Sequence, residues 1–144
     1  MKLVGKGEDM KEQIDDLIIN LIVVKEFSKD IHYTCHGDAF YSKHLLVDKF
    51  DWDEHIDLLK ECCLLGNGER PLSSYEYMTN VINRIPRPNE ADDKNNFKIL
   101  AEKVNNTLDL ISQLKDIHKA DENVIGNVAQ DLQQYLGLIN LQII

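Results

Sequence analysis

Apolar residues recur every three or four positions along four long stretches of this chain, with polar and charged residues between them. This spacing places the apolar side chains on one face of an α-helix. The pattern therefore predicts four long helices. They run from near Asp9 to the break at Gly37, from about Ala39 to Leu65, from about Glu90 to His118, and from about Asp121 to near the end of the sequence.

The connection between the second and third predicted helices carries a helix signal of its own. The segment Gly66 to Gly68 ends the second helix. Ser73 or Ser74 then begins a short helix that reaches about Asn83, and Glu76 is placed to complete a capping box with Ser73.

Together these elements predict a single all-α domain over residues 1–144. Glycine and proline are scarce, at 7 and 3 residues, which favours long helices over many short strands. Four long helices with a long middle connection form an up-and-down bundle with one crossover, which is the ferritin-like arrangement. We expect a ferritin-like four-helix bundle with a short extra helix between the second and third long helices.

Charge and cysteine content narrow the classes of partner. The net charge of −9 repels a polyanion, and neither end of the sequence carries a lysine-rich tail, so no DNA binding is expected. Three cysteines, two of them adjacent, fit a reducing compartment better than a disulfide framework. The most apolar early run, Leu17 to Val24, is too short to span a bilayer. We expect a soluble, cytoplasmic protein with no membrane partner.

Histidines and aspartates gather in residues 32–57, which hold four of the five histidines. Imidazole nitrogen and carboxylate oxygen together suit Fe(II), Mn(II) or Zn(II). His44 and Asp48 are four residues apart on one predicted helix, so they can share an ion. An isolated histidine and aspartate with this spacing more often form a hydrogen bond on a helix surface than a metal site. His55, seven residues beyond Asp48, is a further candidate ligand.

The segment from His32 to Asp48 resembles the signature of the Dps-type miniferritins. It has a histidine, an aromatic residue, a glycine and a phenylalanine, followed by a histidine and an aspartate four residues apart, all at the spacing of that family. These residues are His32, Tyr33, Gly37, Phe40, His44 and Asp48. The resemblance extends more loosely over nearly the whole chain, including the connector from Gly66 to Asn83 and the last helix from Asp121 to Leu141.

The resemblance implies a function as well as a fold. Members of this family form hollow dodecamers, oxidise Fe(II) at a site between two subunits, commonly with hydrogen peroxide, and collect ferric mineral inside. For this chain it implies His32, His44 and Asp48 as iron ligands and catalytic residues from one subunit. Asp57 and Glu61 of a neighbouring subunit are the candidates for the rest of the site. Dioxygen is the alternative oxidant, and Zn or Mn can suit the same ligands.

The sequence departs from the family pattern between Asp48 and Asp57. The gap is two residues shorter than usual, and nine residues of regular helix place these two side chains on roughly opposite faces. A leucine and a cysteine stand at the usual positions, and neither is a ligand for a hard metal ion. Either the helix is distorted here, or the second half of the site is changed or lost. In the latter case His55 or Asp51 could substitute.

Two functions follow from these alternatives. The first is a ferroxidase and iron store that protects against oxidative damage. The second is a structural or interaction shell that keeps the fold but has a degenerate metal site without ferroxidase activity. A monomeric di-iron bundle ranks below both, because the chain has no Glu-x-x-His motif. A further alternative is a helical bundle that binds no metal at all.

Overall fold

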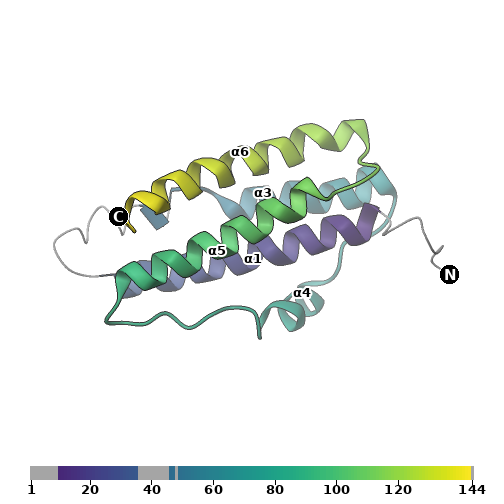
Figure 1. Ribbon diagram of the computed structural model, residues 1–144. Coiled ribbons are helices and arrows are strands. Elements are labelled where there is room, and N and C mark those ends of the chain that lie inside the picture. Colours follow the sequence, from purple (N-terminus) through teal and green to yellow (C-terminus); the bar gives the residue numbers. More distant parts are fainter. Residues whose placement is uncertain (1–9, 36–45, 48, 144) are drawn as a thin grey trace.

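The computed structural model describes residues 10–35, 46, 47 and 49–143, and its elements are helices (Figure 1). Four long helical segments and one short helix follow in the predicted order, so the expected all-α architecture is confirmed. The elements are α1 (Met10–Thr34), α3 (Trp52–Glu61) with the π-helix η1 (Cys62–Gly66), α4 (Ser74–Val81), α5 (Asp93–Ser112) and α6 (Lys119–Leu141).

The long helices form a bundle in which α1 packs against both α3 and α5, and α6 packs against α3 and α5. Figure 1 shows α1 and α6 running in one direction along the bundle and α3 and α5 in the other. Because α3 and α5 are parallel, the connection between them has to return along the length of the bundle, and it carries α4. This is the crossover topology that the sequence predicted.

The core is formed by apolar side chains from all the long helices. α1 contributes more of them than any other helix, because it is buried against α3, α4 and α5. Each fully buried leucine, isoleucine or phenylalanine stabilises the fold by about 1.5–3 kcal/mol relative to its exposed state. Fully buried examples are Leu17, Leu21, Phe27, Leu59, Phe97, Leu100 and Leu132.

The predicted second helix, Ala39 to Leu65, is not continuous, and this expectation was wrong. Much of its first part lies outside the described residues. The backbone then bends at residues 49–50, and the Asp51 carboxylate accepts a hydrogen bond from the Glu54 N–H at 3.1 Å. This N-cap satisfies a free backbone donor of the first turn, so α3 begins anew at Trp52.

α3 ends in η1, a single π-helical turn, rather than in a regular α-helical end. Gly66 in this turn lies against the side chain of Asp121 on α6. A Cβ at Gly66 would lie 2.9 Å from both carboxylate oxygens, so a larger residue there would push the Asp121 carboxylate aside. Gly68 then adopts a positive φ of 67° and ends the helical segment, as predicted for this glycine pair.

The short helix α4 begins with the predicted capping box. The Ser73 hydroxyl accepts a hydrogen bond from the Glu76 N–H at 3.2 Å, and the Glu76 carboxylate accepts one from the Ser73 N–H at 3.0 Å. Both N-terminal donors are therefore satisfied within four residues of sequence. The helix ends at Val81, slightly before the predicted end at Asn83.

The third helix is shorter at both ends than the pattern predicted. α5 begins at Asp93 because the Asp92 carboxylate accepts a hydrogen bond from the Asn95 N–H at 3.0 Å. It ends at Ser112 rather than at His118. The apolar period continues beyond Ser112, but the backbone there finds other hydrogen-bond partners.

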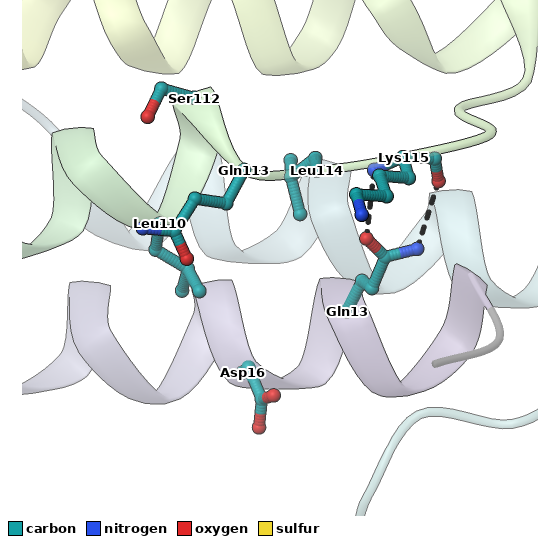
Figure 2. Close-up of a pocket in the computed structure, with 7 residues that line it drawn as sticks. All are labelled: Gln13, Asp16, Leu110, Ser112, Gln113, Leu114 and Lys115. Atoms are coloured by element: carbon teal, nitrogen blue, oxygen red, sulfur yellow. Dashed lines mark hydrogen bonds between the residues drawn. The ribbon is translucent and has the colours of Figure 1, made fainter. Parts of the chain in front are cut away.

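Those partners come from Gln13 on α1. The Gln13 side chain accepts a hydrogen bond from the Lys115 N–H and donates one to the Lys115 carbonyl oxygen, both at 2.9 Å. Figure 2 shows this pair of bonds holding the loop against α1. A backbone segment whose polar groups are satisfied by a side chain has no need to remain helical.

Asp15 is a buried carboxylate on α1 that fixes the crossover connection. It accepts hydrogen bonds from the Tyr77 hydroxyl and, at 3.4 Å, from the Leu72 N–H, and it pairs with Lys11 at 2.5 Å. Burial and the Asp15 carboxylate both raise the pKa of Tyr77, so its hydroxyl remains a donor. These contacts tie α4 and the chain before it to α1.

Candidate metal site

His32 lies in the last turn of α1 and is half-buried. Its ring meets the Tyr33 ring edge to face, with 4.8 Å between the centroids, and Tyr33 itself is 83% exposed. The buried Cys35 thiol donates a hydrogen bond to the His32 carbonyl oxygen at 3.5 Å. The structure therefore places His32 at one end of the bundle, next to an exposed aromatic ring.

His44 and Asp48, the other two predicted ligands of this half-site, lie outside the described residues. Between them the chain is described at Leu46 and Val47, whose side chains are buried in the core. The assignment of His44 and Asp48 as ligands stays a prediction.

Asp57 and Glu61 lie on α3 with exposed side chains. They border different grooves. Asp57 lines a groove of about 410 Å³ between α1, α3 and α4, whereas Glu61 lines one of about 280 Å³ between α3, η1 and the start of α6. Both carboxylates are therefore accessible to a ligand or a second chain, and the grooves they line lie on different sides of α3.

The interruption before α3 changes the expected relation between Asp57 and the preceding motif. The prediction that Asp57 lies opposite Asp48 assumed a regular helix between them. The chain instead bends at residues 49–50 and restarts at Trp52, so the rotation of a continuous helix does not apply. η1 begins only after Glu61, so Asp57 and Glu61 keep regular α-helical spacing.

The two candidate substitutes, His55 and Asp51, are engaged within their own subunit. The His55 Nε2 atom lies 2.7 Å from a carboxylate oxygen of Asp131, which links α3 to α6. Its Nδ1 atom is buried and has no hydrogen-bond partner in the described part of the chain. Asp51 uses a carboxylate oxygen to cap α3. Either residue would have to give up this contact to bind a metal ion through the same atom.

An aromatic cluster supports α3 where it begins. Trp52 and Phe50 pack against Tyr135 of α6, with ring centroids 5.5 and 5.6 Å from that of Tyr135. The Tyr135 hydroxyl forms a hydrogen bond of 2.9 Å with Ser28 on α1 and also reaches the Val47 carbonyl oxygen at 3.5 Å. The sequence pattern gave no signal for this role, although a buried tyrosine hydroxyl usually finds a polar partner in the core.

Cys62 and Cys63 are poor candidates for ligands. Burial raises the pKa of both thiols to about 12, and the Asp121 carboxylate beside Cys62 adds to the effect. Because the thiolate is the form that binds metals, neither residue is reactive near neutral pH. Among residues 10–35, 46, 47 and 49–143, no three His, Cys, Asp or Glu side chains come together to hold one metal ion.

The groove that Figure 2 draws lies near the opposite end of α1. It has a volume of about 560 Å³ and is lined by Gln13, Asp16, Leu110 and residues 112–115. At 1.5 Å per residue, about 24 Å of helix separates Asp16 from His32. This groove is therefore distinct from the candidate metal site.

Comparisons with known proteins establish the fold. No protein-family model matches the sequence, and no curated protein matches it. The structure is similar to that of a Dps protein from Vibrio cholerae O1, with a TM-score of 0.62, 17% identity, and coverage of 93% of this chain and 88% of that one. That protein is described as a member of a broad superfamily of ferritin-like diiron-carboxylate proteins. The structure of this chain is also similar to that of antigen TpF1 from Treponema pallidum, with a TM-score of 0.64, 18% identity and coverage of 99% of both chains.

These similarities show that the chain has the ferritin-like fold of a Dps protein along nearly its whole length. The structure adds one finding about membranes: none of the described helices is long and apolar enough to cross one.

Proposed function

We propose that this chain, which has the ferritin-like fold of the Dps proteins, is an iron-binding miniferritin. It oxidises Fe(II) at a site between two subunits, uses hydrogen peroxide as the oxidant, and stores ferric mineral inside a homo-oligomeric shell, a dodecamer. The activity protects a cytoplasmic compartment against oxidative damage, because it removes Fe(II) and peroxide together.

A single combination of observations carries this proposal. The chain has a fold similar to that of a ferritin-like diiron-carboxylate protein over 93% of its length. In the same chain, the histidine, glycine, phenylalanine and aspartate positions between His32 and Asp48 follow the miniferritin spacing. The fold supplies the bundle that would carry such a site, and the motif supplies its candidate ligands.

The proposed site takes ligands from two chains. His32, His44 and Asp48 of one subunit bind Fe(II) through two imidazole nitrogens and a carboxylate. Asp57 and Glu61 of the neighbour approach from α3, where both side chains are exposed. Nitrogen and oxygen ligands of this kind suit Fe(II) and leave coordination positions for the oxidant. Zn(II) and Mn(II) are expected to compete for the same ligands.

The chemistry is a two-electron reduction of peroxide. Two Fe(II) ions each give one electron to hydrogen peroxide, the O–O bond breaks, and two hydroxide ions form beside two Fe(III) ions. The carboxylates stabilise the higher charge of Fe(III), because opposite charges attract more strongly where water is excluded. Ferric ions that leave the site then collect as hydrated oxide.

The proposal is tested by adding Fe(II) and hydrogen peroxide to the purified protein and following ferric absorbance. We expect faster oxidation than in buffer, and loss of that advantage when His44→Ala and Asp48→Ala are combined. Asp57→Asn with Glu61→Gln should also slow the reaction. Glu102→Gln, at an exposed carboxylate on α5, is the matched control and should oxidise iron normally. A wild-type rate equal to that of buffer contradicts the proposal.

A second function is favoured by a specific observation: Asp57 and Glu61 line different grooves, and both candidate substitutes already have partners within the subunit. On that account the chain is a Dps-like shell or interaction protein whose metal site is degenerate. It predicts a normal assembly that binds no stoichiometric iron after anaerobic loading with Fe(II).

A further inference from the structure

The groove between α3, η1 and the start of α6 has mainly apolar walls. It has a volume of about 280 Å³. Leu58 and Leu65 line it and are 41% and 78% exposed, and the half-buried Val124 lines it from α6. Pockets for drug-sized molecules have volumes of about 300–1,000 Å³. This groove therefore suits a smaller ligand with an apolar part.

A buried carboxylate, that of Asp121, also lines this groove. Asp121 is only 3% exposed and lies in the first turn of α6, where the helix dipole stabilises a negative charge. The Cys62 thiol donates a hydrogen bond to the carboxylate, whereas the Asp121 Oδ2 atom has no donor in the described part of the chain. A buried acceptor without a donor costs free energy, and such atoms are rare in folded proteins. Oδ2 is therefore a position for a donor from outside the described residues.

The charges along the groove determine the sign of its ligand. The residues that line it include two acids, Glu61 and Asp121, and no base. The Glu61 side chain is exposed, and the whole chain carries a net charge of −9. Local and overall charge therefore attract a cation and repel phosphates and carboxylates.

The chemistry of the walls favours an organic cation over a metal ion. The pKa of the Cys62 thiol is raised to about 12, mainly by burial, so this residue supplies no thiolate near neutral pH. Within the part of the chain that the structure describes, no three His, Cys, Asp or Glu side chains meet around one ion. Metal ions require several oxygen, nitrogen or sulfur ligands, which leucine and valine do not supply. Apolar walls instead bury an alkyl chain.

The one free carboxylate oxygen distinguishes between two kinds of organic cation. A guanidinium group binds a carboxylate best through two parallel hydrogen bonds, but the Cys62 thiol already occupies part of the Asp121 carboxylate. A primary ammonium group is a compact charge that can donate to a single oxygen. We propose that this groove binds a primary aliphatic ammonium ion, whose ammonium group donates to Asp121 Oδ2 and whose alkyl chain packs against Leu58 and Leu65. Binding of this ion does not depend on iron.

Calorimetric titration of the purified full chain tests the proposal, at low salt because salt screens charge pairs. Three probes separate the contribution of the charge from that of the alkyl chain. They are n-butylammonium chloride, n-butanol, which has the chain without the charge, and ammonium chloride, which has the charge without the chain. We expect n-butylammonium to bind at one site per chain, about tenfold more tightly than either other probe, because it alone makes both contacts.

Two variants locate the site. Asp121→Asn removes the negative charge with little change of shape and should abolish binding of n-butylammonium. Leu65→Ser removes part of an apolar wall at an exposed position, so the fold is kept and binding should weaken severalfold. Glu122→Gln, at an exposed acid in the same turn of α6, is the matched control and should bind as wild type does. Circular dichroism shows whether each variant is folded, and Leu65→Ser decides the question if Asp121→Asn does not fold.

Three results overturn the proposal. Equal binding of n-butylammonium and n-butanol means that the carboxylate takes no part. Equal binding of n-butylammonium to wild type and to the folded Leu65→Ser variant means that the ion lies elsewhere on the acidic surface. No binding means that the groove is closed to the probe, as it is if a lysine side chain of another chain fills it. None of these measurements involves iron, so their outcome is separate from that of the ferroxidase test.

Discussion

α1 and α3 lie side by side in the bundle but are held in place in different ways. α1 runs for 25 residues without a break and buries apolar side chains against three other helices. α3 has ten residues, begins at a side-chain cap and ends in a π-helix, and it buries only Trp52, Ile56 and Leu59. α1 is held in place by continuous core packing, whereas the position of α3 depends on a few additional contacts.

Those contacts are polar and can be named. Asp51 caps the start of α3, Lys25 pairs with Asp53 to hold it to α1, and His55 contacts Asp131 to hold it to α6. The candidate ligands Asp57 and Glu61 lie on this same helix. This contrast between α1 and α3 indicates that the candidate half-site of Asp57 and Glu61 is positioned by local polar contacts, which single substitutions can remove.

The largest effect is expected in the core of α1. Leu21 is fully buried, so Leu21→Ala should destabilise the fold by about 2–5 kcal/mol through lost burial and the cavity it leaves. Leu58→Ala on α3, where the side chain is 41% exposed, should cost less, about 1 kcal/mol. Chemical unfolding followed by circular dichroism measures both. Equal losses would contradict the contrast between the two helices.

An intermediate effect is expected at the start of α3. Asp51→Ala removes the acceptor of the Glu54 N–H and should cost about 1 kcal/mol. Asp51→Asn keeps a side-chain oxygen at the N-cap and should cost only a few tenths of that amount. If alanine and asparagine have the same effect in chemical unfolding, the cap does not define the beginning of α3.

The smallest effect is expected for the Lys25–Asp53 pair, which is partly exposed. The hydrogen bond from Lys25 lowers the pKa of Asp53 below its ordinary value of 3.8. The pair therefore stabilises the fold above that pH, and this contribution is lost as the pH falls through the lowered pKa. Because solvent screens the pair, Lys25→Met should cost at most about 1 kcal/mol at neutral pH.

The matched control is Lys98→Met, at an exposed position on α5. The stability difference between wild type and Lys25→Met should disappear in acid, whereas Lys98→Met should follow wild type throughout. Unfolding curves at several pH values measure this. A difference that persists at low pH would mean that Lys25 acts through packing of its aliphatic stem instead.

Much of the fold was predictable because its signals are local. The apolar period of α1 and the capping box of Ser73 and Glu76 each depend on residues within one or a few turns. The break at residues 49–50 was not predictable, because the apolar spacing continues across it and Asp51 is one of several acids that could cap or remain solvated. Similarly, α5 ends early because of Gln13, which is 102 residues away from its partner Lys115 in the sequence.

The candidate site was predictable only as a set of residue types. The spacing around His32 identified a half-site, and the structure places His32 beside Tyr33 at one end of α1. The bend before Trp52 agrees with the alternative in which the helix is distorted between Asp48 and Asp57, and residue spacing could not choose between the two alternatives. The partners of His55 and Asp51 depend on tertiary contacts and local caps that residue spacing does not specify.

The most direct test of the central claim, a metal site shared between two chains, is an anaerobic Fe(II) titration combined with native mass measurement. The account predicts an assembly of several chains that binds iron in a fixed ratio per chain, and that loses this iron in the Asp57→Asn, Glu61→Gln variant while keeping its mass. An intact assembly that binds no stoichiometric iron, or that binds it equally well without these two carboxylates, would contradict the account.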